Sequence, residues 1–222
     1  LRAVPARYLY TRAMMGIHTG FLIVFEGIDG SGKSTQAKLL TNKLLENGHD
    51  AILTREPGGT SLSETLGIWL KQFPDRSALT EVLLFSAART EHINQLISPS
   101  LARGQIVVCD RYISSTIAYQ GHGKGIDLNF IQQVNSQATT GIIPSLTFLL
   151  DIPFEVGQAR KDQQSLDVFE KEKSDFYQKV REGYLACAAS DPGYWIILDG
   201  ALPPEHLSEI IWGEVTGLLK KC

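Results

Sequence analysis

From residue 21 to the C-terminus, short runs of consecutive hydrophobic residues alternate with longer stretches that mix hydrophobic and polar residues. A short hydrophobic run without polar interruption is typical of a strand that is buried on both faces of a sheet. Such runs predict strands at residues 21–25, 51–54, 106–109, 145–150 and 195–198.

The mixed stretches repeat hydrophobic residues every three or four positions, which is typical of helices with one buried face. In the first stretch Ala37, Leu40 and Leu44 follow this spacing, and Gly48 suits the position just beyond a helix end. The same reasoning predicts helices at residues 33–47, 62–71, 79–103, 128–139, 174–189 and 204–220.

The alternation of strands and helices predicts the fold class. Strands separated by helices pair in parallel through right-handed crossovers. We therefore predict an α/β fold: an open, doubly wound, five-stranded parallel sheet with helices on both faces. No repeat or long linker divides residues 21–222, so we expect one domain, with ligands at the carboxyl ends of its strands.

The composition excludes several classes of protein. The 222 residues include 21 Lys and Arg against 24 Asp and Glu, so no overall positive field exists to bind nucleic acid. No hydrophobic run reaches the roughly 20 residues of a membrane helix. The three cysteines, Cys109, Cys187 and Cys222, are too few and too scattered for a disulfide framework or a zinc site. We expect a cytoplasmic protein.

The first segment, residues 1–20, differs from the rest of the chain. It contains Arg2, Arg7 and Arg12 but no acidic residue, which is a faint likeness to a transit peptide. We favour the alternative that it is an extension ahead of a start at one of the two methionines. In either case we expect this segment to lie outside the fold.

One motif directly follows the first predicted strand and opens the first predicted helix. Residues 27–34 match G-x-x-x-x-G-K-S/T, a phosphate-binding P-loop. Its backbone N–H groups would surround phosphate oxygens, Lys33 would reach the β- and γ-phosphates, and Ser34 would bind Mg²⁺. The predicted nucleotide-binding residues are Gly27, Asp29, Gly30, Ser31, Gly32, Lys33, Ser34 and Thr35. The alternative, a glycine-rich turn with a surface lysine, is not favoured in this context.

Two arginines point to a second phosphate-bearing substrate. Arg55 follows the second predicted strand in T-R-E-P-G-G-T, and Arg111 follows the third in D-R-Y. Each could form a structural ion pair, but together with Lys33 they exceed what ATP alone needs. Guanine-specific switches carry N-K-x-D, and the nearest match, at 42–45, ends in leucine. A nucleoside-monophosphate kinase is therefore the leading interpretation.

Five segments match one enzyme family in order and spacing. They are F-E-G-I-D-G-S-G-K-S-T at 25–35, R-E-P-G-G-T at 55–60, L-L-F-S-A-A-R at 83–89, D-R-Y at 110–112 and S-S-T-I-A-Y-Q-G-H-G-K-G at 114–125. On these segments the chain closely resembles the thymidylate kinase family. The R-E-P-G-G-T segment combined with the P-loop is highly specific, whereas D-R-Y alone is not.

The resemblance implies roles at the phosphates and the sugar. Asp29 would accept a hydrogen bond from the 3′-OH of the acceptor, although an Asx turn would also explain this residue. Arg55 and Arg111 would hold the dTMP phosphate, and Asp110, with Ser34, would lie beside Mg²⁺ or its waters. A cis peptide bond would precede the proline of R-E-P.

The resemblance also implies how thymine is bound. Phe85 would stack on the base and Arg89 would donate to its O4, both from one face of a helix. Tyr119 would close the sugar pocket against a 2′-OH. Hydroxyls near base N3 and an amide near the base or phosphate complete the set: Ser115, Thr116 and Gln120. Without the resemblance, Phe85 would be interpreted as a core residue and the later segment as an ordinary helix.

The chain departs from the family's pattern at the catalytic arginine. Family members place one in the P-loop, at the position of Gly30, or in a lid segment. Here the lid region, about residues 157–170, has glutamines and Val168 where arginines are expected, and its remaining cations are Arg160 and Lys161. We predict that Arg160 is the principal mobile cation and approaches the ATP phosphates when the lid closes. The alternative is a solvated arginine on a helix surface.

These observations predict an ATP- and Mg²⁺-dependent kinase that converts dTMP to dTDP. The acceptor phosphate is already an anion, so no general base is needed, and the predicted catalytic residues are Lys33, Asp110, Arg111 and Arg160. The resemblance also implies a homodimer. Two alternatives stay open: a kinase for dUMP or UMP, and a nucleotide-binding regulator with little turnover.

Overall fold

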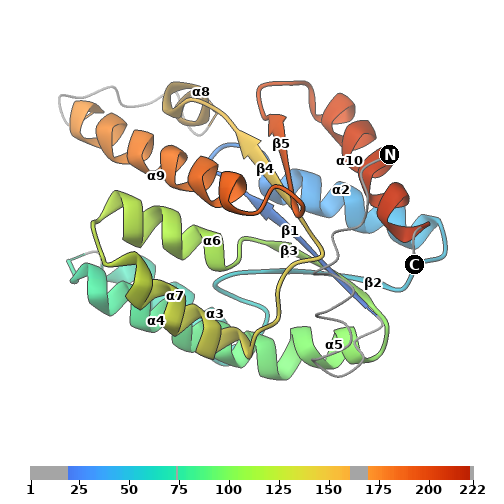
Figure 1. Ribbon diagram of the computed structural model, residues 1–222, viewed down its shortest axis with the longest axis horizontal. Helices are drawn as coiled ribbons and strands as arrows, with labels where there is room; N and C mark the ends of the chain where they lie inside the picture. The colour runs from blue at the N-terminus through green and yellow to red at the C-terminus, as the bar shows by residue number, and fades with distance from the viewer. Residues whose placement is uncertain (1–19, 74, 161–169, 221–222) are drawn as a thin grey trace.

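A five-stranded parallel sheet lies at the centre of the molecule (Figure 1). The structure, a computed structural model, describes residues 20–73, 75–160 and 170–220. The strands are β1 (Phe21–Glu26), β2 (Ala51–Arg55), β3 (Ile106–Asp110), β4 (Leu146–Asp151) and β5 (Trp195–Asp199). Their spatial order is β2-β3-β1-β4-β5, and every neighbouring pair is parallel. The predicted α/β fold is confirmed, and each predicted strand overlaps an observed one.

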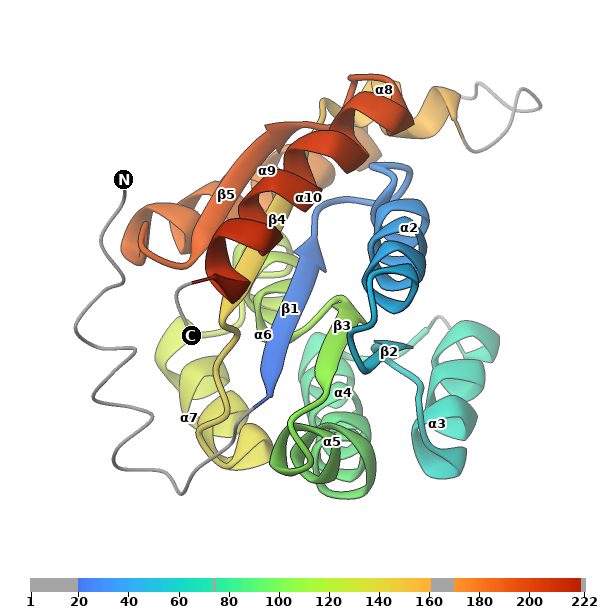
Figure 2. The same cartoon turned by 90° about the vertical axis from the view of Figure 1, so that its right-hand side faces the viewer.

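The three central strands, β1, β3 and β4, are covered on both faces, which explains why they are almost continuously hydrophobic. Along β1, Phe21, Ile23 and Phe25 pack with α2 (Lys33–Glu46) and α10 (Pro204–Leu219) in one buried cluster. The alternate residues, Leu22 and Val24, belong to a second cluster on the opposite face. Figure 2 shows α2 and α10 together on their side of the sheet.

The opposite face carries most of the remaining helices. Those that pack there or on its outer layer are α4 (Ala78–His92), η1 (Ile93–Ile97), α5 (Ser98–Ala102), α6 (Ile113–Thr116), η2 (Ile117–Gly123), α7 (Leu128–Thr139) and α9 (Glu170–Ser190). The helix α3 (Ser61–Gln72) lies beside α4, and α8 (Phe154–Ala159) follows β4. None of the described helices is both long and apolar enough to span a membrane.

Two helical segments near the carboxyl edge of the sheet differ from the prediction. They are α6–η2 and α8, which were not among the predicted helices, whereas the helix predicted at 79–103 is present as the consecutive segments α4, η1 and α5. The segment of α6 and η2 is rich in Ser, Thr and Gly, so its periodicity is weak. Its position depends on α9: a Cβ on Gly123 would lie 2.6 Å from the Phe176 ring, and one on Gly183 would lie 2.9 Å from His122. The two glycines permit this close approach of η2 and α9.

The topology brings the ends of distant strands to one edge. Because all strands are parallel, Glu26, Asp110 and Asp151 lie at the same edge, at the carboxyl ends of β1, β3 and β4. The P-loop connects β1 to α2 at this edge. The segment predicted to lie outside the fold, residues 1–20, falls almost entirely outside the described residues.

Candidate active site

The P-loop has the backbone geometry that its glycines make possible. Gly27, Gly30 and Gly32 have φ angles of 141°, 82° and 96°, values that residues with a side chain rarely adopt. Lys33 Nζ donates to the Ile28 carbonyl oxygen at 2.8 Å and is buried. Burial, followed by the nearby Arg111 charge, lowers the pKa of Lys33 to about 7.

A cavity of about 560 Å³ lies over this loop. It is lined by every predicted nucleotide-binding residue except Gly27, and further by Gln36, Asp110, Arg111, Arg160, Gly200, Leu202, Pro204 and Leu207. The N-terminus of α2 opens into this cavity, so backbone N–H groups and the helix dipole favour an anion there. The geometry suits a nucleotide polyphosphate.

A hydroxyl and a carboxylate lie together at the base of this cavity. The Ser34 hydroxyl donates to Asp110 Oδ2, while Asp110 Oδ1 is buried with no hydrogen-bond partner among the described residues. Buried polar atoms without partners are rare, and hard oxygen ligands are those that Mg²⁺ prefers. The described residues hold no cluster of three His, Cys, Asp or Glu for a metal. The Ser34–Asp110 pair therefore fits a Mg²⁺ ion whose remaining ligands are phosphates and waters.

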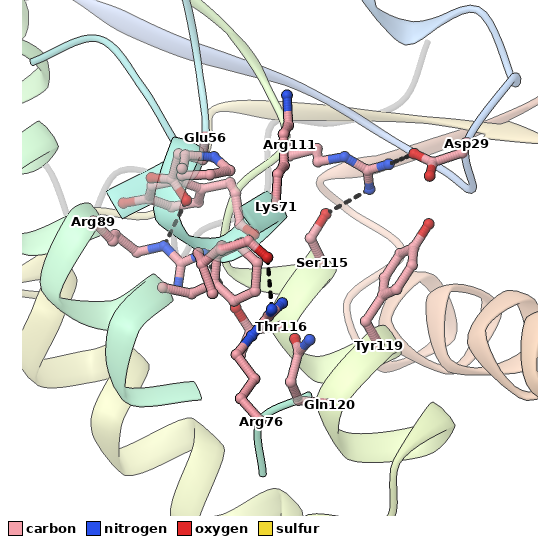
Figure 3. Close-up of a pocket in the computed structure, with 15 residues that line it drawn as sticks. Asp29, Glu56, Lys71, Arg76, Arg89, Arg111, Ser115, Thr116, Tyr119 and Gln120 are labelled. Carbon is pink, nitrogen blue, oxygen red and sulfur yellow. Dashed lines mark hydrogen bonds and ion pairs between the residues drawn. The ribbon is translucent and has the colours of Figure 1, made fainter. Parts of the chain in front are cut away.

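A second cavity, of about 300 Å³, lies on the other side of Arg111 (Figure 3). Its lining comes from the P-loop, the segment after β2, α3, α4 and the α6–η2 segment: Asp29, Glu56, Pro57, Gly67, Leu70, Lys71, Arg76, Phe85, Arg89, Arg111, Tyr112, Ser115, Thr116, Tyr119 and Gln120. A cis peptide bond joins Glu56 and Pro57 in this lining, as the resemblance implied. The lining combines hydrophobic and aromatic side chains, such as Leu70, Phe85 and Tyr119, with several charged and polar groups, which suits a small molecule that carries both a ring and a charge.

Arg111 and Asp29 line both cavities. The Arg111 guanidinium donates from Nη2 to Asp29 Oδ1 at 2.5 Å and from Nη1 to the Gly27 carbonyl oxygen at 3.2 Å. Its backbone has a φ angle of 73°, an uncommon value for a residue with a side chain. A cation held in this way lies where phosphates from the two cavities would meet.

A buried carboxylate, Glu26, organises the residues around Arg111. It accepts hydrogen bonds from the Tyr112 N–H at 2.9 Å, the Ser115 N–H at 3.2 Å and the Ser115 hydroxyl at 2.7 Å. Burial raises the pKa of Glu26, and the Ser115 hydrogen bond and the Arg111 charge oppose this effect. Glu26 thereby ties the end of β1 to the start of α6.

Arg89 lies at the inner wall of the second cavity and is almost fully buried. It donates to Glu56 Oε2 at 2.7 Å, to Asn135 Oδ1 at 2.7 Å and to the Thr116 hydroxyl at 3.2 Å. Glu56 is also 3.3 Å from His92 Nδ1. Arg89 Nη2 also donates to the Tyr112 carbonyl oxygen at 3.2 Å, so four acceptors hold the guanidinium, and a buried cation held in this way presents its remaining N–H in a defined direction.

Tyr119 and Gln120 complete the wall formed by η2. The Tyr119 ring lies over the Arg111 guanidinium at 5.3 Å, and its hydroxyl points toward Asp29 (Figure 3). Gln120 Nε2 donates to Glu81 Oε2 at 3.0 Å, which fixes its amide. The cavity therefore has the Arg111 guanidinium and the Tyr119 ring beside Asp29 at one end, which we call the phosphate end, and its other walls carry fixed polar groups that include Arg89 and Gln120.

Comparison with known proteins identifies the family. A family model described as thymidylate kinase matches residues 25–211. The chain belongs to the thymidylate kinase family. It is 44% identical over 203 residues to the thymidylate kinase of Thermomicrobium roseum, covering 90% of this chain and 97% of that one. The thymidylate kinase of Desulforudis audaxviator is 42% identical over 205 residues, covering 91% and 93% of the two chains.

A solved thymidylate kinase structure has the same fold. The crystal structure of the enzyme from Ehrlichia chaffeensis superposes with a TM-score of 0.75 at 35% sequence identity, covering 89% of this chain and 98% of that one. Family membership does not favour either alternative, a kinase for dUMP or UMP or a nucleotide-binding regulator with little turnover.

Two residues that the thymidylate kinase resemblance assigns to dTMP differ in position from what we expected. Arg55 is at the carboxyl end of β2, but it pairs with Glu64 at 2.8 Å, is 64% exposed, and lines neither cavity. The Ser115 hydroxyl is engaged by Glu26 and Arg111, at the phosphate end of the cavity and not beside Arg89. Their roles toward dTMP stay predictions.

The structure shows why the P-loop accommodates no side chain at residue 30. A Cβ on Gly30 would lie 2.2 Å from the carbonyl oxygen of Gly157 in α8, so a side chain would collide with the backbone there. Arg160 lies at the end of α8 and donates to the carbonyl oxygens of Gly200 at 2.9 Å and Gly30 at 3.3 Å. Its guanidinium already lines the nucleotide cavity, whereas we expected it to arrive there on closure. Lys161 and Val168 lie outside the described residues.

Several residues that line the second cavity, contact Arg111 or hold the residue next to it were missed from the sequence. Glu26 and Glu56 stand inside matched segments, F-E-G and R-E-P, so their neighbours could have indicated them. Lys71 and Arg76 line the second cavity from the end of α3 and the segment after it. Tyr184 contacts Arg111 from α9, and no local pattern distinguishes it from a core tyrosine.

Proposed function

We propose that the protein transfers the γ-phosphoryl group of ATP to dTMP and forms dTDP, with Mg²⁺. One observation carries this proposal: the cavity over the P-loop and the second cavity share Asp29 and Arg111. A polyphosphate in the first and a monophosphate in the second would therefore meet at one guanidinium. The family, whose members compared above are named thymidylate kinase, supplies the identity of the acceptor.

On the ATP side, the P-loop N–H groups and Lys33 would bind the β- and γ-phosphates. Mg²⁺, held by Ser34 and Asp110, would supply a positive charge that offsets the charge of the phosphate oxygens. Asp110 Oδ1 supports this assignment because it is buried without a partner among the described residues. These groups orient the γ-phosphoryl group toward the second cavity.

On the acceptor side, Arg111 would hold the dTMP phosphate in line with the γ-phosphorus of ATP. The attacking oxygen is already anionic, so catalysis consists of positioning and charge neutralisation. Asp29, which pairs with Arg111 through Oδ1, is 40% exposed at the side chain and would accept the 3′-OH of the sugar. Arg55 would have to break its ion pair with Glu64 before it could bind the dTMP phosphate.

The base would occupy the end of the cavity formed by α4 and η2. Phe85 and Arg89 line this end, and Arg89 donates a hydrogen bond to the Thr116 hydroxyl. Because the Arg89 guanidinium is held by protein acceptors on most of its N–H groups, a remaining N–H would donate to thymine O4. Tyr119 would leave little room for a 2′-OH.

We further propose that Arg160 supplies the charge that other family members obtain from a P-loop or lid arginine. Its contact with the Gly30 carbonyl oxygen supports this, because Gly30 is the position where a P-loop arginine would stand. The close approach of Gly30 and Gly157 requires such an arginine to come from elsewhere. A guanidinium at the end of α8 meets this requirement.

A homodimer through α4 and α7 is a further part of the proposal. Leu79 and Leu83, 46% and 51% exposed, lie one turn apart on α4. Between α4 and α7 lies a groove of about 480 Å³ with hydrophobic residues such as Phe130 and Val134 in its lining. Light scattering on the parent should give the mass of two chains, and Leu83→Lys should give the mass of one.

We also propose a cytoplasmic location. Cys109 and Cys187 are free thiols, and burial raises the pKa of both, which suits unreactive thiols in a reducing compartment. Fractionation of source cells, followed by detection of the protein, would test the location.

The decisive experiment is an assay of ADP release with ATP, Mg²⁺ and a panel of dTMP, dUMP, UMP and dGMP. We expect the highest kcat/KM for dTMP, with dTDP as the product. A higher kcat/KM for dUMP or UMP than for dTMP would show that the preferred acceptor is that monophosphate and not dTMP. Nucleotide binding without ADP release for any acceptor would refute the proposed activity and support a regulatory protein.

A further inference from the structure

The backbone of Arg111 is held in a conformation that a non-glycine residue rarely adopts. Its φ angle is 73°, and the flanking backbone is fixed on both sides: the Arg111 N–H donates to the Phe25 carbonyl oxygen at 2.9 Å and the Tyr112 N–H donates to Glu26 at 2.9 Å. Uncommon backbone conformations persist where surrounding contacts determine them, and they cluster at functional sites. This conformation directs the side chain back across the end of β1.

One edge of the Arg111 guanidinium is fully occupied by protein acceptors. Nη1 lies 3.2 Å from the Gly27 carbonyl oxygen, 3.1 Å from the Ser115 hydroxyl and 3.0 Å from the Tyr184 hydroxyl. Nη1 has two hydrogens for these three acceptors. The contacts of Nη1 therefore orient the guanidinium so that Nη2, which pairs with Asp29, lies between the two cavities.

Tyr184 is the acceptor that comes from farthest along the chain. It lies in α9, 73 residues after Arg111, and is buried. Its hydroxyl is also 2.9 Å from the Ser115 hydroxyl, which donates to Glu26 Oε2 at 2.7 Å. With Ser115 donating to Glu26, the Tyr184 O–H donates to Ser115, and both oxygens are left to accept from Arg111. The Tyr184, Ser115 and Glu26 side chains thus form one chain of hydrogen bonds that ends on Arg111.

We propose that Tyr184 is a positioning residue for phosphoryl transfer: its hydroxyl orients Arg111 toward the acceptor phosphate and makes that orientation depend on the packing of α9. This inference rests on the proposed assignment of Arg111 to the acceptor phosphate. In Tyr184→Phe the ring would still pack in the core and keep the position of α9, but Nη1 of Arg111 would have one acceptor fewer. The guanidinium could then rotate, and a misplacement of about 1 Å can cost on the order of 10²-fold in rate.

The test compares Tyr184→Phe with Tyr194→Phe in the full chain. Tyr194 is a buried tyrosine just before the amino end of β5, the end of the sheet opposite the P-loop, so the same substitution there controls for the loss of a buried phenol oxygen. We expect Tyr184→Phe to lower kcat with dTMP at least about tenfold. We expect Tyr194→Phe to retain the kcat of the parent.

Binding measurements distinguish positioning from a structural role. Calorimetry should show that Tyr184→Phe weakens dTMP but leaves thymidine, which has no phosphate, within about twofold of the parent affinity. The proposal would be overturned if Tyr184→Phe weakened the binding of dTMP and of thymidine equally. It would also be overturned if the variant had the dTMP affinity and the kcat of the parent. Ser115→Ala combined with Tyr184→Phe should cost less than the sum of the single effects, because the two residues act through one chain of hydrogen bonds. Additive losses would count against it.

The binding experiment also separates this proposal from the proposed function. If the parent phosphorylates another monophosphate in place of dTMP, the same comparison is made with that monophosphate and its nucleoside. A loss confined to the monophosphate would then support the role of Tyr184 while refuting dTMP as the acceptor. If the parent binds no monophosphate, both proposals are refuted.

Discussion

Replacing Glu56 with glutamine removes one charge from the ion pair that holds Arg89. The side chains of Arg89 and Glu56 are 2% and 6% exposed, and they are 2.7 Å apart. Removing one partner of a buried pair leaves an uncompensated charge and costs about 3–5 kcal/mol. Glu56→Gln keeps the shape of the side chain, so this cost arises from charge and not from a cavity.

The matched control is Glu64→Gln, which makes the same change in an exposed pair. Glu64 lies 2.8 Å from Arg55, and the two side chains are 44% and 64% exposed. Exposed pairs contribute about 0–1 kcal/mol, so urea unfolding should show a much smaller loss than for Glu56→Gln. The KM for dTMP should also rise in Glu56→Gln, because the Arg89 Nε–H would then donate to a neutral amide oxygen in place of a carboxylate, and this weaker hydrogen bond holds the guanidinium less firmly. Equal losses of unfolding free energy in the two variants would refute the reasoning that burial makes the Glu56–Arg89 pair a structural requirement.

Three further predictions concern the nucleotides. Because the pKa of Lys33 is lowered to about 7, this lysine is mostly neutral at pH 8 and charged below pH 7, so ATP affinity should fall as the pH rises through 7. Calorimetry at pH 8 in buffers of different ionisation enthalpy should show that the protein takes up as much as about one proton when ATP binds. Lys33→Met should take up no proton. The absence of proton uptake by the parent would contradict the lowered pKa of Lys33. Arg160→Ala should lower kcat at least about 10²-fold and change the KM for dTMP far less, with partial activity in Arg160→Lys; a parent-like kcat would exclude Arg160 as the cation. Tyr119→Ala should narrow the preference for dUMP over UMP by about tenfold in kcat/KM, and an unchanged preference would remove Tyr119 from the sugar pocket.

The sequence by itself determined the features that depend on neighbouring residues. Hydrophobic runs predicted all five strands: β1, β3 and β4 are buried on both faces, and the edge strands β2 and β5 keep mostly hydrophobic sequences although Leu53 and Ile197 are exposed. The P-loop was identified because its glycines, its lysine and its hydroxyl act within eight consecutive residues, 27–34. The parallel order of strands and helices then placed Arg55 and Asp110 at the carboxyl edge, where the structure has them.

Only the tertiary structure decided which partner each of these side chains meets. Arg55 and Arg111 stand at equivalent strand ends, yet one pairs with Glu64 on the surface and the other with Asp29 between two cavities. Tyr184 reaches Arg111 only because η2 and α9 pack closely. Contacts between residues far apart in the chain depend on how whole elements pack, and the pattern of neighbouring residues does not determine that packing. The uncommon backbone conformation of Arg111 likewise depends on hydrogen bonds to Phe25 and Glu26 in β1, far earlier in the chain, so no property of the D-R-Y segment alone could have shown it.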